Sequence, residues 1–479
     1  MQANASRSLK ERVGILHSRK NGSSIKKGSA IGDYPRIAYI LIAFCVFSYP
    51  FYASSLLPMR LSLAMSIAGL CAVVLLFLTR GIINFSHTGW FASWFVVGLI
   101  AAASAGASGY SYDSTHVWYP LMFTLSVLIM LMCSRSADWI LPTLQTIVVM
   151  LIPFALGTIV LYFIPDLFAP VKNVLFPDSY FATGYQSGLT THYSYNGTYN
   201  IVGFLISIGL LLFSGKTGKH KRLWIAAMLI FAFALMLIGK RQNLVFGAFA
   251  VFVVYAASGN RGKTFKIALT LSVLLVALEL AISYIPGVEA SFDRLFDTFE
   301  ADDVSESTSG RTFIWEAAIK GWESSPLFGH GWGVFTYQFS INNTVHAAHN
   351  ELLNLLYEAG IVGAVATTLC VLFSLAATWI AFRGTNRSEA LAACDLPYKA
   401  ALGVSLLIQT YLVVTGYTIG SLFSSPSSFM PYFLAVAIAI ACRWSLKRKE
   451  PPSKSLSGPA SSGYRSANIK KRVAHRKMS

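Results

Sequence analysis

Long apolar runs recur along almost the whole of this chain, and they constrain its fold more than any other feature. Twelve runs approach the ~20 residues that a helix needs to cross the hydrocarbon core of a bilayer. They cover residues 37–58, 61–79, 89–107, 117–133, 139–164, 197–214, 222–239, 242–257, 266–285, 360–382, 399–420 and 429–446. Charged residues make up only 12% of the chain, against about 25% in an ordinary soluble domain. The pattern predicts an all-α polytopic membrane protein and excludes a soluble enzyme and a disordered chain.

The distribution of lysine and arginine predicts the orientation of these spans. If the N-terminus lies inside, the segments assigned to the inside hold 31 of the 38 lysines and arginines, and seven fall outside. Such an asymmetry follows the positive-inside rule. Both termini are therefore predicted to be cytoplasmic. The net charge of +17 then indicates topology and favours no nucleic-acid partner.

Three regions follow from the composition. Residues 1–36 and 447–479 are basic tails with few apolar residues, which predicts solvated cytosolic segments and no cleavable signal peptide. Residues 37–446 form the predicted transmembrane catalytic domain. Two outer loops within it, 165–196 and 286–348, are too long to be turns. Loops of this length usually carry function or are disordered.

The second outer loop contains a predicted amphipathic helix at about residues 311–323. Its polar stripe includes Glu316 and Lys320, an i, i+4 pair of opposite charge. Its apolar face carries Trp315 and Trp322. We expect this helix to lie in the membrane interface, with both tryptophans at the depth of the lipid headgroups.

Cations on the outer side mark a candidate binding site. Lys240 and Arg241 lie at the junction of two spans, where a charge near the hydrocarbon edge is costly and suggests a partner. They could snorkel to lipid phosphates. Together with Arg311 they could instead clamp a diphosphate, because a guanidinium binds phosphate oxygens in a bidentate manner.

A histidine marks a second candidate position. A short helix is predicted to begin at residues 349–351 and to enter the membrane at Gly360, with a polar stripe of Glu351, Asn354 and Glu358. His349 would then lie one short helix above the hydrocarbon edge. It could act as a general base on a hydroxyl group, or it could cap the N-terminus of the helix.

Other motifs carry weaker signals. His192 lies among tyrosines at the end of the first long loop, which fits a sugar site or an interfacial aromatic belt. Glu279 lies inside a predicted span, where it is either paired with a neighbouring helix or functional. His346 and His349 lack a convincing third ligand, so no metal site is predicted. Residues 259–264 resemble the end of a phosphate-binding loop, but the spacing is wrong.

The segment 309–363 combines several of these residues in a familiar order. It reads Ser309-Gly310-Arg311, then Trp315, then Pro326-Leu327 with Gly329 and Gly331, then His349-Asn350, nine residues, Gly360, two residues and Gly363. This segment resembles the O-antigen ligase and O-antigen polymerase superfamily. The part from His349 to Gly363 matches the ligase-type signature at each of its positions.

The resemblance implies an all-helical, GT-C-like glycosyltransferase that needs no metal and no other cofactor. Such enzymes move a glycan from undecaprenyl diphosphate to an acceptor, on the periplasmic face of the bacterial inner membrane. By position, His349 would match the essential histidine of the family, and Arg241 and Arg311 its diphosphate-binding arginines. Further residues expected at the substrate are Lys240, Asn350, His192, Lys172 and Glu279.

The sequence departs from the family pattern in two places. Lys240-Arg241 replaces the usual Ser-Arg pair, and the first long loop has Lys172 where the family has an arginine. Two acceptors remain open, with a slight preference for the first. A ligase joins the glycan to lipid A–core, whereas a polymerase joins it to another lipid-linked repeat unit of O-antigen or exopolysaccharide. A lipid-glycan flippase or transporter would also fit twelve spans, but its expected internal repeats are not evident.

Overall fold

The helices of the computed structural model follow the apolar runs closely where both can be compared. The structure describes residues 139–175, 185–213, 221–259, 311–335, 340–341, 344–345, 348–385, 398–418, 422–423 and 426–449, with shorter stretches at 68, 71–72, 75, 93–94, 96–101, 137 and 420. Apart from one pair of two-residue strands, β1 (Ser340–Ile341) and β2 (Thr344–Val345), the regular elements of this part are helices.

Five helices in the described part are long and apolar enough to cross a membrane. They are α7 (Ile140–Phe163), α9 (Tyr193–Phe213), α17 (Glu351–Gly384), α18 (Tyr398–Thr418) and α19 (Pro426–Lys449). Two shorter helices, α10 (Lys221–Leu237) and α11 (Arg241–Ala257), fall on two further predicted runs. In the part of the chain that the structure describes, the prediction of a largely α-helical, multi-pass membrane protein is confirmed. The predicted runs 37–58, 117–133 and 266–285 lie outside the described residues, so the total of twelve and the GT-C-like arrangement stay predictions.

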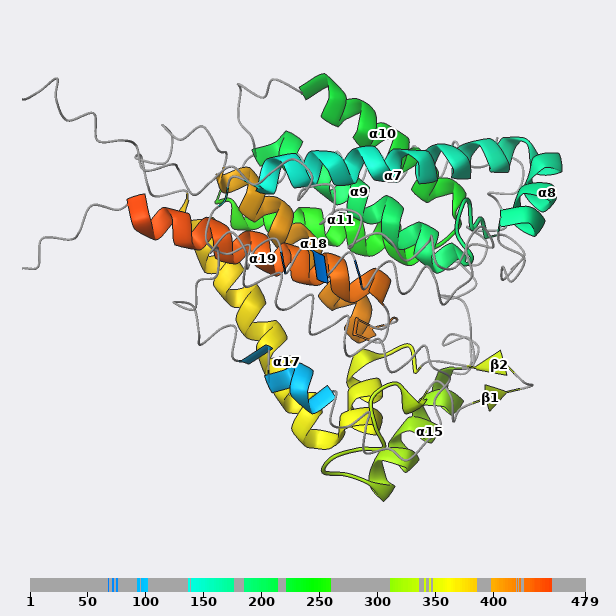
Figure 1. Ribbon diagram of the computed structural model, residues 1–479, viewed down its shortest axis with the longest axis vertical. Coiled ribbons are helices and arrows are strands. Elements are labelled where there is room, and N and C mark those ends of the chain that lie inside the picture. Colours follow the sequence, from blue (N-terminus) through cyan, green and yellow to red (C-terminus); the bar gives the residue numbers. More distant parts are fainter. Residues whose placement is uncertain are drawn as a thin grey trace, which may run out of the picture. The chain divides into compact units, whose positions relative to one another are not determined.

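Helix α9 lies at the centre of the packing, in contact with α7, α10, α11 and α18 (Figure 1). Its interface with α18 depends on glycines. A Cβ on Gly209 would meet Val404 at 2.6 Å, and one on Gly403 would meet the ring of Phe213 at 2.3 Å. Small residues at such positions let two helices approach closely, which is how helices pack when both are surrounded by lipid.

Buried polar side chains join the last three helices. The amide of Gln409 on α18 donates to Thr378 of α17 and to Ser405, and the hydroxyl of Ser405 donates to the carbonyl of Ala435 in α19. Hydrogen bonds of this kind satisfy polar atoms that would otherwise be costly in an apolar medium.

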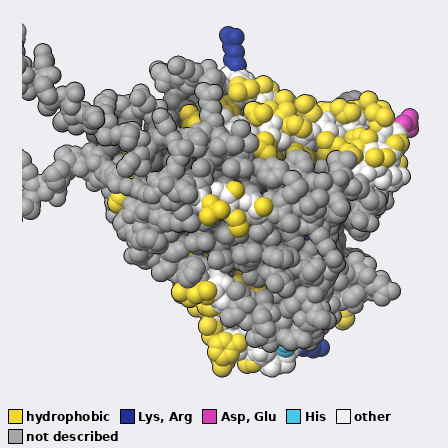
Figure 2. Space-filling view, viewed as in Figure 1, with side chains coloured by type: hydrophobic (Ala, Val, Ile, Leu, Met, Phe, Trp, Pro, Cys, Tyr) yellow, Lys and Arg dark blue, Asp and Glu magenta, His cyan; other side chains and the backbone are white. Residues whose placement is uncertain are grey.

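The outward faces of the peripheral helices are apolar. Val149, Val160 and Phe163 of α7 and Leu229 of α10 are about half exposed or more. In Figure 2 the described surface on this side is mostly hydrophobic. In a soluble protein such a surface would be a liability, whereas in a membrane protein it contacts lipid.

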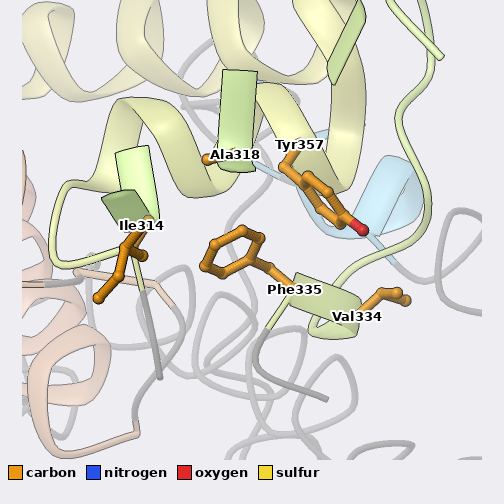
Figure 3. Packing of buried hydrophobic residues seen from close by; sticks show 6 residues of the cluster. Ile314, Ala318, Val334, Phe335 and Tyr357 are labelled. Carbon is orange, nitrogen blue, oxygen red and sulfur yellow. The ribbon is translucent and has the colours of Figure 1, made fainter. Parts of the chain in front are cut away.

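A second packing unit forms around α15 (Arg311–Ser324) and the start of α17. Ile314 and Ala318 of α15 are buried against Phe335 and Tyr357, and Figure 3 shows the ring of Phe335 between Ile314 and Tyr357. The predicted helix at 311–323 is therefore confirmed. Its apolar face is divided, however, since Phe313 is 61% exposed while Ile314 packs inward.

The start of α17 is kinked at Gly360, and the backbone of residues 326–328 packs against the kink. Gly360 has φ 61° and ψ −171°, a conformation that is essentially restricted to glycine. The N–H groups of Ile361 and Val362 donate to the carbonyls of Pro326 and Leu327 at 2.9 and 3.3 Å. A Cβ on Gly360 would meet the backbone of Leu327 at 2.3 Å. Pro326-Leu327 and the segment that begins at Gly360 therefore form one hydrogen-bonded backbone junction.

One expectation needs correction. The loop predicted at 165–196 contains a helix, α8 (Pro165–Leu175), and α9 already begins at Tyr193. The short helix predicted before the membrane-spanning run at 360–382 is present: it begins at Glu351, and the chain is kinked at Gly360, where that run begins. Its polar stripe is buried, because the side chains of Glu351, Asn354 and Glu358 are at most 2% exposed.

That buried stripe supports the loops around α17. Glu351 accepts hydrogen bonds from the backbone N–H groups of Leu422 and Phe423. Asn354 accepts one from Ala348 at 3.2 Å. Glu358 accepts hydrogen bonds from the backbone of Gly333 and Phe335. One helix face therefore holds three loops, including the one that carries His349.

Candidate functional site

A cavity of about 240 Å³ lies where α9, α18 and the starts of α11, α17 and α19 meet. Three of the predicted site residues line it, namely His349, Lys240 and His192. The remaining lining residues are mostly hydroxyl and amide side chains with a few small or apolar ones: Ser194, Tyr195, Thr198, Gln242, Tyr411, Leu412, Thr415, Gly416, Gly420, Ser427 and Ser428. None of these described lining residues is acidic. The cavity therefore suits a ligand that is rich in oxygen and carries negative charge.

The backbone at His349 adopts a conformation that is rare for a side-chain-bearing residue. Its φ is 53°, and it is the only non-glycine residue with positive φ in the part of the chain that the structure describes. Histidine tolerates the left-handed region better than most residues, yet the conformation still costs energy. Strain of this kind persists where neighbouring contacts enforce it, and it is enriched at functional sites.

Contacts on both sides of His349 enforce this conformation. Before it, the N–H of Ala348 donates to Asn354 and its carbonyl accepts a hydrogen bond from the indole N–H of Trp315 at 2.9 Å. After it, Asn350 caps α17 by accepting hydrogen bonds from the N–H groups of Leu352 and Leu353 at 3.0 and 3.3 Å. The alternative in which His349 itself caps the helix is wrong, because Asn350 occupies that position.

Lys240 places a cation in the same cavity. It lies at the residue before α11, and its ammonium group donates to the hydroxyl of Ser194 at 2.9 Å. It also lies 5.8 Å from the centroid of the Tyr193 ring, within range of a cation–π interaction. Burial, together with the nearby charge of Arg311, lowers the pKa of Lys240 to about 7.

Arg311, the first residue of α15, lies beside this lysine. Burial lowers its pKa, while the neighbouring Tyr193 and Tyr185 favour its charged form. An arginine nevertheless stays protonated under all ordinary conditions. Lys240 and Arg311 are close enough to interact electrostatically, and each also interacts with Tyr193, although Arg311 is not one of the residues that line the cavity.

A third cation, Lys172, is buried near His192 but does not line the cavity. It is the buried residue of α8, fully shielded from solvent, and its ammonium group donates to the carbonyl of Thr190. Burial lowers the pKa of Lys172 to about 7. It also acts electrostatically on His192. The amide of Asn196 holds the same loop through the carbonyl of Gln186 at 3.1 Å.

Three further predicted site residues do not line the cavity in the described structure. Asn350 lies next to His349, and its side-chain oxygen is engaged in the helix cap. Arg241 is the first residue of α11, but its side chain lies outside the described part. Glu279 lies outside the described residues altogether.

Helix α18 contributes a wall of the cavity that was not predicted from the sequence. Tyr411 donates its hydroxyl to the side-chain oxygen of Asn243 at 2.8 Å, and both are buried. Thr415 lines the cavity one turn further along. Polar residues inside an apolar run are costly in a membrane and mark functional or packing positions. Gln409, Tyr411 and Thr415, within the apolar run 399–420, could therefore have indicated that this helix contributes to the site.

No group of three or more metal-binding side chains occurs among the described residues. The arrangement offers cations for an anionic group and hydroxyl groups for a sugar. It also holds one histidine in a fixed position, where it can accept or donate a proton. A multi-pass membrane protein with a site for an anionic, oxygen-rich ligand is the class of protein that fits this fold and site.

Comparison with known proteins supports the resemblance seen in the sequence. Residues 196–368 match the family model described as O-antigen ligase. The matched segment includes Lys240, Arg311 and His349, and it ends before α18. The match indicates glycan transfer of the ligase or polymerase type, with lipid-linked glycans in a membrane. No curated protein matches the chain.

Proposed function

We propose that this protein transfers a glycan from undecaprenyl diphosphate to an acceptor on the periplasmic face of the bacterial inner membrane, without a metal ion. The most favoured acceptor is lipid A–core, which makes the protein a ligase-type enzyme. The observation that carries the proposal is the convergence on one cavity of Lys240 with the strained His349, with Arg311 beside Lys240.

The chemistry follows from the charges of these groups. The diphosphate of the donor is already an activated leaving group, and its negative charge increases as the bond to the sugar breaks. Lys240 and Arg311 stabilise that charge, with Arg241 as a further candidate at the start of α11. Preorganised cations can do this without a metal ion, because they are held in place before the reaction begins.

His349 acts on the acceptor. Its ring takes the proton from the attacking hydroxyl as that oxygen forms a bond to the anomeric carbon, while the bond from that carbon to the phosphate oxygen breaks. The released group is undecaprenyl diphosphate. A single displacement inverts the anomeric configuration, and measuring the configuration of the product tests this step.

The size of the cavity limits what it holds. Its 240 Å³ lies below the roughly 300–1,000 Å³ of pockets for drug-sized ligands. We infer that it takes the diphosphate and the reacting sugar in part, with the remaining repeat unit outside. The acceptor is therefore chosen elsewhere, which is why a polymerase of O-antigen or exopolysaccharide remains the second candidate.

The test is transfer by the purified full-length protein in detergent, with an undecaprenyl-diphosphate-linked glycan as donor. With lipid A–core added, a ligase gives glycosylated lipid A–core. With donor alone, a polymerase gives a ladder of longer lipid-linked products. H349Q should abolish either product. H330Q is the matched control, since His330 lies outside the cavity and bonds to the carbonyl of Gly321.

Deletion of the gene in its host provides the cellular counterpart. A ligase leaves full-length chains on the prenyl carrier, a polymerase leaves a single repeat on lipid A–core, and unchanged lipopolysaccharide indicates a separate exopolysaccharide. Failure of the purified protein to consume the donor, with folding verified, would reject the proposal in favour of a flippase or transporter.

A further inference from the structure

His192 is held in one orientation by its immediate neighbours. The ring lines the cavity together with Lys240 and His349. It stacks on Tyr193 at a centroid distance of 4.2 Å and meets the edge of Tyr195 at 5.8 Å. The stack continues to Tyr185, which lies 4.2 Å from Tyr193. The ring therefore cannot turn without disturbing the start of α9.

A backbone hydrogen bond decides which ring nitrogen carries the proton. The N–H of Ser194 points at Nδ1 of His192, at 3.0 Å. A backbone N–H can only donate, so Nδ1 must accept and cannot hold a proton. The single proton of the ring is then on Nε2, and the imidazole is neutral. Protonating it would break this hydrogen bond and place two N–H groups against each other.

The charges around His192 also favour its neutral imidazole. The groups that face His192 are Lys240 before α11, Lys172 on α8, and the rings of Tyr193 and Tyr195 on α9. Burial, together with the charges of Lys240 and Lys172, lowers the pKa of His192 to about 4. The hydrogen bond from Ser194 and the lowered pKa therefore both favour the neutral imidazole near neutral pH.

We propose that His192 is a permanently neutral hydrogen-bond donor, which holds an oxygen of the donor's diphosphate through Nε2–H. This inference rests on the proposed function and adds a substrate-binding residue to it. The two histidines of the cavity then have different tasks. His349 exchanges a proton with the acceptor, whereas His192 keeps its proton throughout and contributes only a hydrogen bond. Lys240, which lines the same cavity, supplies the charge.

The experiment compares two substitutions of His192. The amide nitrogen of H192Q reaches about where Nε2 lies and still donates, whereas H192L fills similar space and cannot donate. We expect H192Q to keep kcat/KM within a few-fold of the wild type. We expect H192L to lose about 10- to 100-fold, the usual effect of deleting a hydrogen bond to a charged group. The acidic limb of the pH–rate profile should persist in H192Q, because His192 does not cause it.

A direct measurement complements the kinetics. The ¹⁵N signals of the His192 ring, assigned by difference from H192Q, should show the neutral Nε2–H tautomer from pH 5 to pH 8. Titration of this ring within that range would overturn the inference, whether or not H192L folds. Equal losses in H192Q and H192L, with both folded, would also overturn it, as would an H192L enzyme as active as the wild type.

Failure here is distinguishable from failure of the proposed function. If H349Q still transfers glycan, the proposed function is wrong. If H349Q is inactive while H192L is unaffected, only the role of His192 is wrong.

Discussion

A lysine and two histidines share one cavity, yet their charges respond to pH in different ways. Lys240 has its pKa lowered to about 7 by burial, and the pKa of His192 falls to about 4 for the same primary reason. Near neutral pH the lysine is therefore partly charged while His192 is neutral. Because an anionic ligand favours the charged lysine, binding of a diphosphate should draw a proton onto Lys240.

This difference predicts how affinity depends on pH. The charged form of Lys240 exists below its pKa, so affinity for a diphosphate is highest below pH 7 and falls as the pH rises through that value. For a short-chain prenyl-diphosphate sugar, a diester whose own charge is constant, we expect about a tenfold loss in affinity between pH 6 and pH 8. Titration calorimetry at several pH values measures this.

K240R is the matched variant for that titration. An arginine stays charged throughout the range, so most of the pH dependence should disappear, with the remainder due to Lys172. An unchanged pH profile in K240R would show that another group controls binding.

At the scale of elements, the start of α17 organises the site more than any other segment. Its cap fixes the chain directly after His349, its buried polar stripe holds three loops, and its kink is hydrogen-bonded to the backbone of Pro326 and Leu327. The sequence revealed the helix, the histidine and the glycine spacing. It did not reveal that the stripe is buried, because a polar i, i+3, i+7 pattern is equally typical of a solvated face, and only long-range partners distinguish the two.

The cap of α17 controls the position of His349. In N350A the N–H groups of Leu352 and Leu353 lose their acceptor, which costs about 0.5–2 kcal/mol. Since the cap also fixes the strained backbone of His349, we expect transfer activity to fall at least about tenfold, more than this change in stability would explain. Activity and thermal unfolding in detergent are measured on the same samples.

N350S serves as control, because serine is also a good N-cap residue. It should recover most of the activity. If N350S were as impaired as N350A, the asparagine would have a direct role at the substrate, which is the role that the family resemblance implies.

The kink at Gly360 can be tested by adding a single methyl group. In G360A the new Cβ would occupy the position of the Leu327 backbone and the residue would keep an unfavourable φ. We expect a destabilisation of about 1–3 kcal/mol from the strain alone, seen as a lower unfolding temperature. G384A, near the end of the same helix, has open space around it and should be neutral. A wild-type unfolding temperature in G360A would contradict the proposed junction.

At the scale of the whole molecule, hydropathy predicted the helices well because a bilayer demands long apolar segments whatever their tertiary contacts. The starts and ends of α7 and α18 agree with the predicted runs within two residues. The cavity could not be predicted in the same way. Its walls come from residues 192 and 428 and from points between, and no local pattern indicates that these segments meet.

The orientation in the membrane is testable without activity. The distribution of basic residues predicts that residue 305 faces the periplasm and residue 457 the cytoplasm. In a cysteine-free background, S305C should react with a membrane-impermeant maleimide in intact cells whose outer membrane is permeabilised. S457C should react only after lysis. Labelling of S457C in intact cells would reverse the topology and place the cavity on the wrong face for a periplasmic enzyme.

The backbone junction between residues 326–331 and 357–362 has a consequence for engineering. Its hydrogen bonds cross between two segments about 30 residues apart, and each half supplies the space that the other requires. A chimera that takes one half from a relative and the other from this chain would pair surfaces that were never selected together. Breakpoints for exchanging acceptor preference therefore belong before Arg311 and after Gly363, so that the interlocked segment is inherited whole.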